Sequence, residues 1–366
     1  MSLRRKPLFT ATVAFSTIPV VAALGLATAG AAQAQASCTP DVGGTGLSAA
    51  VVARAHQRIS HRVVDATGCD IGIYVGAGAR RVSIRSTTVT GANFQGIFAE
   101  RTSHLTISHS TVTRNAFNTI DPSAPPLPGS GVHSWVGQSF AISLFGVSHA
   151  AVSGNKVYNN GRGGIGLMDN GPFDPGAKMQ NQNPDAPLVR SSHVKIVDNK
   201  TWANYNGCGI VAATQNVGGR LSRLSIRGNR IVGTGLGTAG PDIGGIVVAA
   251  DLPGSKVAHV NVNDNRVRKS FEAGLIVNAE APGSSTTAVH LYGNKVSGNN
   301  VGHLEAPDTA GVVTFAAPGA ANHGTMIWGN DISNQFYGVW SRGDLPPKVF
   351  HNDIDVTAGG VPISLG

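Results

Sequence analysis

The chain has 366 residues, a formal net charge of +8 and charged side chains at only 13% of positions. A single hydrophobic core stops growing at roughly 250–300 residues, so this length excludes one compact core and indicates two domains or one elongated, repetitive domain. Abundant glycine (48 residues) with sparse charge is typical of a turn-rich all-β protein, and the positive charge favours acidic partners.

Residues 1–36 have the pattern of a secretion signal. Three basic residues within the first six precede an apolar stretch and an Ala-x-Ala cleavage site that ends at Ala34 or Ala36. A retained membrane anchor is the alternative, but Pro19 interrupts the stretch and small residues follow it. We therefore predict a cleaved signal peptide and a secreted or extracytoplasmic protein. No integral membrane span is expected after cleavage, because no later apolar run is long enough.

Residues 37–70 are predicted to form an N-terminal cap. Between Leu47 and Arg58, Ala, Val and Arg are interleaved in a way that predicts a helix. Such a helix would seal the first coil of a solenoid, whose open end exposes core and strand edges. Cys38 and Cys69 bracket this segment and can close as a disulfide after export, with Cys208 left as a buried thiol.

A repeated unit occupies the rest of the chain, residues 71–366. It reads small or His, apolar, any, apolar, any, any, Asn, any, Val or Ile, as in residues 148–157. The Asn position is held in successive copies by Thr87, Ser110, Asn155, Asn199, Asn229, Asn265, Asn294, Asn330 and Asn352. Asn tolerates left-handed turns, and stacked amides can hydrogen-bond along a column. The shortest spacing, 22 residues, corresponds to one bare coil, and longer spacings add loops.

A second motif, Gly followed by an aliphatic residue, alternates with the first. It occurs at Gly96-Ile97, Gly164-Ile165, Gly209-Ile210, Gly245-Ile246, Gly274-Leu275, Gly311-Val312, Gly338-Val339 and Gly360-Val361. Short strands broken by Gly and Asn turns cannot bury an apolar face alone, but stacked coils join these faces into one core. The predicted fold is an all-β, right-handed, single-stranded parallel β-helix with an N-terminal helical cap.

These motifs resemble the pectate-lyase-like right-handed β-helix superfamily, including generic β-helix-repeat proteins and NosD-like copper-maturation proteins. The resemblance covers about Ile71 to Gly366 and is nearly silent on activity, since this fold hosts lyases, hydrolases, epimerases and adhesins. Asp121-Pro122-Ser123-Ala124 resembles the Asp-Pro-His-Asp motif of alginate C5-epimerases. Ser123 and Ala124 replace the catalytic His and the second Asp of that motif, which counts against epimerase activity.

The Gly-Ile strands are expected to form the floor of a groove. Long loops, Asn118–Ser139 and Asp169–Ser191, lie at its two edges, and its outward residues are unusually apolar. Phe315 and Trp340 on this floor can stack on sugar rings, with coverage by the protein's own loops as the alternative. The candidate catalytic residues on the groove rim are His133, His149, His193, Asp169, Asp251 and Glu280. A rim His would transfer a proton and a carboxylate would be its partner.

Asp251 and Glu280 occupy equivalent places on successive coils, so their carboxylates are expected about 5 Å apart. Such a pair suits acid/base catalysis or Ca²⁺ binding, although acidic residues in exposed turns are commonly only solvated. Calcium is the candidate cofactor, and no defined metal site is predicted. The column that contains His149 and His193 can also bind a metal, but parallel ligands do not readily enclose a tetrahedral ion.

Basic residues follow the Asn position on five successive units: Lys156, Lys200, Arg230, Arg266 and Lys295. Stacked coils would align them as a stripe with one charge every ~5 Å, which matches an acidic polysaccharide or other polyanion. The alternative is that these side chains merely pack their aliphatic stems over their neighbours. Nucleic acid is not an expected partner of an exported chain with few aromatics among its basic residues.

The sequence therefore predicts a secreted β-helix protein that acts on an acidic polysaccharide as a lyase or hydrolase. The alternative is a non-catalytic extracellular solenoid that binds glycans or proteins. No complete catalytic signature is present. Two or three titratable groups converging within ~3–5 Å would favour the enzyme, and dispersed groups the binder.

Overall fold

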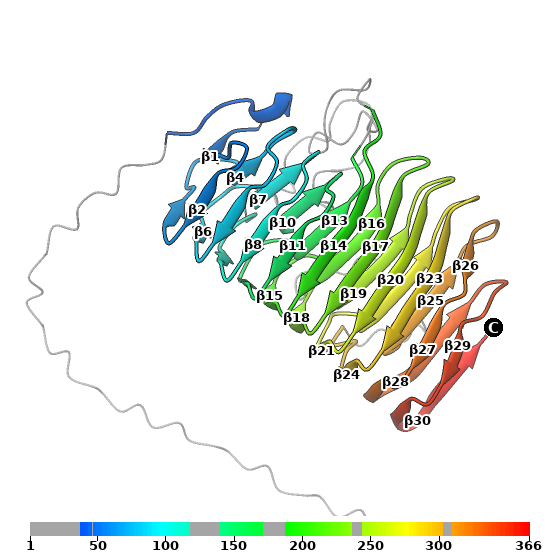
Figure 1. Ribbon diagram of the computed structural model, residues 1–366. Coiled ribbons are helices and arrows are strands. Elements are labelled where there is room, and N and C mark those ends of the chain that lie inside the picture. Colours follow the sequence, from blue (N-terminus) through cyan, green and yellow to red (C-terminus); the bar gives the residue numbers. More distant parts are fainter. Residues whose placement is uncertain (1–36, 46, 118–139, 171–186, 236–243, 303–308) are drawn as a thin grey trace, which may run out of the picture. The chain divides into compact units, whose positions relative to one another are not determined.

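A computed structural model describes residues 37–45, 47–117, 140–170, 187–235, 244–302 and 309–366 (Figure 1). These residues wind into stacked coils of short strands, and strands at equivalent places in successive coils pair in parallel. The predicted all-β, right-handed parallel β-helix is confirmed. The predicted signal peptide lies outside the described residues. In the part of the chain that the structure describes, no helix has the length and apolar character that a membrane crossing requires.

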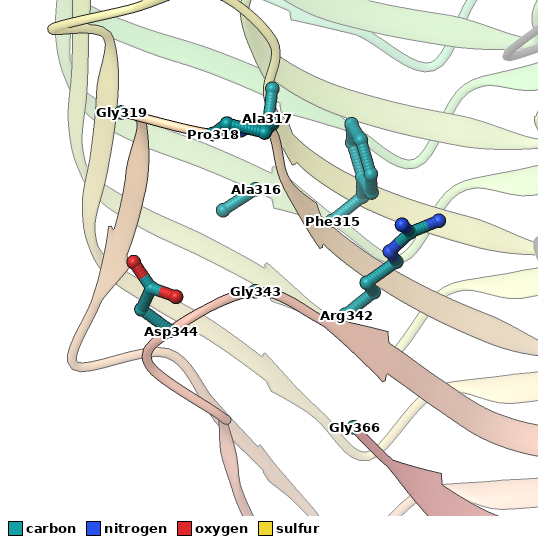
Figure 2. A pocket seen from close by; sticks show the side chains of 9 residues that line it. All are labelled: Phe315, Ala316, Ala317, Pro318, Gly319, Arg342, Gly343, Asp344 and Gly366. Atoms are coloured by element: carbon teal, nitrogen blue, oxygen red, sulfur yellow. The ribbon is translucent and has the colours of Figure 1, made fainter.

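The Gly-Ile sheet contains the strands that carry the glycine motif. Its strands are β1 (Ala49–Val52), β4 (Ile71–Val75), β7 (Gln95–Glu100), β10 (Phe140–Phe145), β13 (Gly163–Met168), β16 (Ile210–Thr214), β19 (Ile246–Ala250), β22 (Leu275–Ala279), β25 (Val312–Ala316) and the second halves of β28 (Asp331–Arg342) and β30 (Asp353–Leu365). At its C-terminal end, the pairing of β25 with β28 sets Phe315 beside Arg342 (Figure 2).

The back sheet contains the strands that precede the Asn position in each coil. Its strands are β2 (Arg58–Ser60), β5 (Ser83–Arg85), β8 (Thr106–Ser108), β11 (Ala151–Ser153), β14 (Ser191–Val197), β17 (Arg220–Arg227), β20 (Lys256–Asn263), β23 (Ser285–Tyr292), β26 (Ala321–His323), β27 (Met326–Trp328) and β29 (Lys348–Phe350).

The basic sheet contains the short strands that follow the Asn position. Its strands are β3 (Val63–Asp65), β6 (Thr88–Thr90), β9 (Thr111–Thr113), β12 (Lys156–Tyr158), β15 (Lys200–Asn204), β18 (Arg230–Thr234), β21 (Arg266–Arg268), β24 (Lys295–Ser297) and the first halves of β28 and β30. Since β28 and β30 run through both, the basic and Gly-Ile sheets are joined at the C-terminal end.

Aliphatic side chains fill the interior of the coils. Ile142, Ile165 and Ile210 pair in register and are fully buried, as are their equivalents in the other coils. Each such side chain contributes roughly 1.5–3 kcal/mol when removed from water. Ile165 and Ile210 follow glycines that sit where backbones approach closely: a Cβ at Gly209 would meet the Gly245 carbonyl and the Ile231 side chain. The Gly-Ile motif therefore encodes a close contact between coils followed by an inward residue.

The predicted Asn ladder is confirmed. From Asn155 to Asn352, each Nδ2 donates to the Oδ1 of the next ladder residue at 2.9–3.0 Å. Ser110 extends the column, because its N–H donates to Asn155 Oδ1 at 2.9 Å. The sequence did not predict a second, shorter ladder between the basic and Gly-Ile sheets. There Asn115 Nδ2 donates to Asn160 at 3.2 Å, and Asn160 Nδ2 donates to Asn204 at 2.9 Å.

The prediction of a helix between Leu47 and Arg58 is wrong. This segment instead contains β1 and the start of β2, and Ala49 pairs with Ile71. Pairing with the next coil overrides a weak helix propensity, because β-branched residues such as Val51 and Val52 suit a pleated strand. Among the described residues, the helical structure is a single 3₁₀ turn, η1 (Val42–Gly44). That residues 37–70 seal the solenoid stays a prediction.

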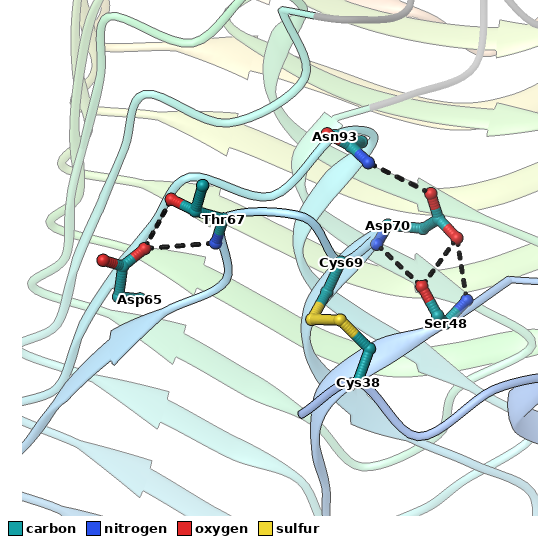
Figure 3. The surroundings of a disulfide bond; sticks show 7 residues. All are labelled: Cys38, Ser48, Asp65, Thr67, Cys69, Asp70 and Asn93. Carbon is teal, nitrogen blue, oxygen red and sulfur yellow. Dashed lines mark hydrogen bonds between the residues drawn. A yellow bond between two sulfur atoms is a disulfide. The ribbon is translucent and has the colours of Figure 1, made fainter. Parts of the chain in front are cut away.

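The predicted disulfide between Cys38 and Cys69 is present, with Cα atoms 5.6 Å apart (Figure 3). It closes a 31-residue separation, which corresponds to about 4 kcal/mol in the chain-entropy account. Beside it, Asp70 accepts hydrogen bonds from the Ser48 N–H at 2.9 Å and the Ser48 hydroxyl at 2.8 Å. These contacts fasten the N-terminal segment to the first coils. Cys208 is buried, as expected.

Candidate functional site

The outward face of the Gly-Ile sheet is apolar, as predicted, but it is buried over most of its length. Phe98 and Phe145 are fully buried and pack edge to face, with ring centroids 5.4 Å apart. Val247, further along the face, is only 4% exposed. The floor on these coils therefore has the character of a second core.

Phe315 and Trp340 lie at the C-terminal end of this floor, where it is only partly buried. Phe315 and Arg342 line a cavity of about 500 Å³, with Asp344 on its other side (Figure 2). This cavity contains one guanidinium and one carboxylate beside an aromatic ring. It lies on a different sheet from the basic stripe, so the predicted binding residues are not all brought together.

The three predicted catalytic carboxylates belong to an acidic row at the ends of the Gly-Ile strands. Asp169, Gln215, Asp251 and Glu280 are the first residues after β13, β16, β19 and β22. Gln215 joins two of the carboxylates: its N–H donates to Asp169 Oδ1 at 2.6 Å, and its Nε2 donates to Asp251 Oδ2 at 3.1 Å. Glu280 accepts a hydrogen bond from Asn278 at 3.0 Å.

Asp169 is completely buried, and this burial raises the pKa of its carboxyl to about 6. Hydrogen bonds from the Gln215 N–H and from Asn216 Nδ2, at 2.7 Å, favour the ionised form and offset part of the rise. The neighbouring Asn170 donates to Glu100 at 3.0 Å. Burial and the Glu100 charge raise the pKa of Tyr74, whose hydroxyl donates to the same carboxylate at 2.5 Å.

The histidine column is an exposed stack at the start of the back-sheet strands. His104 and His149 have ring centroids 5.1 Å apart, and His149 and His193 4.6 Å, with nearly parallel rings. Arg223 continues the column, with Nη1 3.0 Å from His193 Nε2. Partial desolvation, His149 and Arg223 together lower the pKa of His193.

A structural reason explains why histidine recurs here. These residues have positive φ angles, 53° for His149 and 55° for His193, and His is enriched in this left-handed region. His133 lies outside the described residues. Within the described ranges, no group of three or more His, Cys, Asp or Glu side chains is arranged to hold a metal ion.

The basic stripe is aligned as predicted. Its members pair in register on consecutive coils and are exposed: Lys156, Lys200, Arg230, Arg266 and Lys295. Lys295 ends the stripe and forms an exposed ion pair with Asp331, with Nζ 3.4 Å from Oδ2.

A second outward column, two residues further along the same strands, was not predicted from the sequence. It contains Tyr158, Trp202, Val232 and Arg268. The rings of Tyr158 and Trp202 stack with centroids 4.2 Å apart. A cavity of about 230 Å³ is lined by Lys200, Thr201, Trp202, Arg230, Val232 and Arg268. The signal was present in the sequence, because side chains two residues apart on a strand share a face.

A second opening adjoins this column at the turn after the basic sheet. Its volume is about 460 Å³, and its lining includes Arg114, Phe117 and Tyr205. Phe117 and Tyr205 are each 51% exposed, which is high for large aromatic side chains. Exposed rings and basic side chains thus continue from the strands of the basic sheet onto the neighbouring turn.

Comparisons with known proteins agree on the architecture. Residues 50–251 match the family described as right handed beta helix region. Among solved structures, the Azotobacter vinelandii mannuronan C-5 epimerase AlgE6 A-module is 16% identical, covering 81% of this chain and 65% of that chain (TM-score 0.50). The AlgE4 A-module is 13% identical, covering 86% and 80% (TM-score 0.53).

The Streptococcus pneumoniae surface protein and adhesin PfbA is 12% identical, covering 87% of this chain and 90% of that chain (TM-score 0.37). No curated protein sequence matches the chain. The chain thus shares its fold with the two epimerase modules, and identities this low show the fold alone.

Proposed function

The chain belongs to the right-handed β-helix family, and we propose that it is a secreted protein that binds acidic polysaccharides along its basic sheet. In this account residues 1–36 are the cleaved signal peptide, residues 37–70 cap the solenoid and residues 71–366 form the binding domain. Membership of the family indicates the fold and not an activity, so the ligand class depends on the charged and aromatic residues of the site.

The basic stripe beside a stacked Tyr158–Trp202 pair carries the proposal. Lys200 and Arg230 are directly adjacent across paired strands, and like charges in this arrangement destabilise a sheet. A linear polyanion along the stripe would neutralise this repulsion. The aromatic rings add a surface on which sugar rings can pack. Charge and aromatic surface together favour an acidic glycan over a polyanion without rings.

The stripe also has a defined end. After Lys295 the same position is occupied by Asp331 and then by Asp353. Five basic residues on consecutive coils span about 19 Å, and beyond them the column is acidic. This change of sign limits the length of polymer that the face can hold.

The candidate catalytic residues support binding over turnover. Asp169 is buried among hydrogen-bond donors, whereas His149 and His193 form an exposed stack. The epimerase-like segment, which lies outside the described residues, lacks the catalytic His of its motif, since Ser123 stands there.

Salt-dependent retention of the mature protein on immobilised polygalacturonate and alginate tests the proposal. Reversing two stripe charges, Lys200→Glu with Arg230→Glu, is expected to weaken binding about a hundredfold at low salt. The matched control is Arg220→Glu with Lys256→Glu, an exposed basic pair on adjacent back-sheet strands. Equal losses in both variants would contradict a site on the basic sheet.

A second candidate function, polysaccharide lyase or hydrolase, is favoured by one observation. Gln215 donates hydrogen bonds to both Asp169, whose pKa is raised to about 6, and Asp251, so two carboxyl groups in different environments lie on adjacent strand ends. The test is formation of unsaturated uronate or new reducing ends on acidic polysaccharides, with and without Ca²⁺. Activity that is abolished by both Asp169→Asn and Asp251→Asn would establish the enzyme, and silence across the panel would exclude it.

A further inference from the structure

We propose that the cavity between Trp202 and Arg268, above Val232, is a slot that holds one uronate ring of the bound polysaccharide. This inference rests on the proposed function and makes it more specific. It turns a charged stripe, which would accept many polyanions, into a subsite that distinguishes an acidic sugar from other negative chains.

The slot arises from the order of residues in one column. Tyr158 covers one face of the Trp202 ring, so the opposite face points along the column toward the next coil. That coil places Val232 there, a short side chain that leaves space above the sheet. Arg268, one coil further, closes the far side. Trp202 and Arg268 are thus two coils apart, about 9.6 Å, which is room for one ring between them.

The two walls of the slot have different chemistry. The free face of Trp202 can pack against the apolar face of a sugar ring. Arg268 presents a planar guanidinium, the group that best matches a carboxylate. Its Nε is buried and has no hydrogen-bond partner within the described residues. A change of rotamer would turn this donor, which the protein leaves without a partner, toward a carboxylate bound in the slot.

The sides of the slot point to an acidic ligand as well. Lys200 and Arg230 line the same cavity and are exposed members of the stripe. A neutral sugar would stack on Trp202 but leave three cations unmatched. Polyphosphate would match the cations but offer no ring to Trp202. A uronate carries a sugar ring and a carboxylate on one residue, so it is the ligand class that matches both Trp202 and the three cations.

Filling the slot is the sharpest test. Val232→Phe would extend the Tyr158–Trp202 stack into the cavity without changing charge. The matched control, Ser333→Phe, adds the same ring to an equivalent outward position three coils from Val232. Binding of trigalacturonate to the mature protein is measured by titration calorimetry. Retention on polyphosphate resin serves as the charge-only readout.

We expect Val232→Phe to weaken trigalacturonate binding about tenfold, with polyphosphate retention unchanged and Ser333→Phe like wild type. Binding by Val232→Phe that equals wild type, or a loss that is the same for both ligands, would overturn the slot while leaving the proposed function intact. A wild-type protein that binds no acidic polysaccharide would overturn both.

Discussion

The outward faces of the Gly-Ile sheet and of the basic sheet belong to the same coils but differ in how far their side chains are exposed. On the Gly-Ile sheet, outward residues such as Phe145 and Val247 are buried and form a second apolar core. On the basic sheet, outward residues such as Lys200 and Arg230 are exposed. Both faces come from strands with the same backbone geometry. In this β-helix the side-chain character of an outward column therefore accompanies its burial: the apolar column is covered and the basic column is exposed.

The largest expected effect comes from placing one charge on each face. Val247→Lys would bury an ammonium in the Gly-Ile floor and destabilise the protein by about 4 kcal/mol. Val232→Lys, on the preceding strand, enters a half-buried position beside the solvent and should change stability by less than about 1 kcal/mol. Urea denaturation of both variants makes the comparison. Similar losses would show that the two faces do not differ in burial.

The pH dependence of stability tests the acidic row. Burial raises the pKa of Asp169 from an ordinary 3.8 to about 6, so the folded state binds more protons between these values. The contribution of Asp169 to the free energy of unfolding is therefore fully present below about pH 4. It falls by up to about 3 kcal/mol as the pH rises to about 6, because the buried carboxyl must then ionise. Asp169→Asn should remove this fall, which thermal unfolding at a series of pH values measures. An unchanged pH profile would show that Asp169 titrates normally.

A smaller effect distinguishes positions within the stripe. Lys200→Gln should weaken binding to polygalacturonate about fivefold, the equivalent of one lost charge contact near a surface. Lys295→Gln should have less effect, because Lys295 already pairs with Asp331. Retention at low salt compares the two variants. A larger loss for Lys295→Gln would move the site toward the C-terminal coils.

Much of the fold could be predicted from the sequence because its signals are periodic. The Asn ladder and the Gly-Ile motif recur along the coils, so the register of the basic stripe followed from them. The error at Leu47–Arg58 has a different cause: this segment contains no copy of the repeat, and its strand β1 forms through pairing with β4 and a bridge from Ala49 to Thr39.

The site was predicted less completely. The Trp202–Arg268 slot depends on Val232 being shorter than its neighbours, a difference that a consensus motif does not include. His149 and His193 were chosen for their chemistry, whereas left-handed backbone angles give a structural reason for His there. The hydrogen bonds of Gln215 to Asp169 and Asp251 join residues from three coils, and a repeat pattern does not specify side-chain orientation.

The most direct test of the central claim is lysine acetylation of the mature protein, with and without polygalacturonate, read by mass spectrometry. Lys156 and Lys200 on the basic sheet and Lys195 and Lys256 on the back sheet are all exposed. The account predicts that the polymer protects Lys156 and Lys200 and leaves Lys195 and Lys256 reactive. Protection of the back-sheet lysines, or of all four equally, would contradict it.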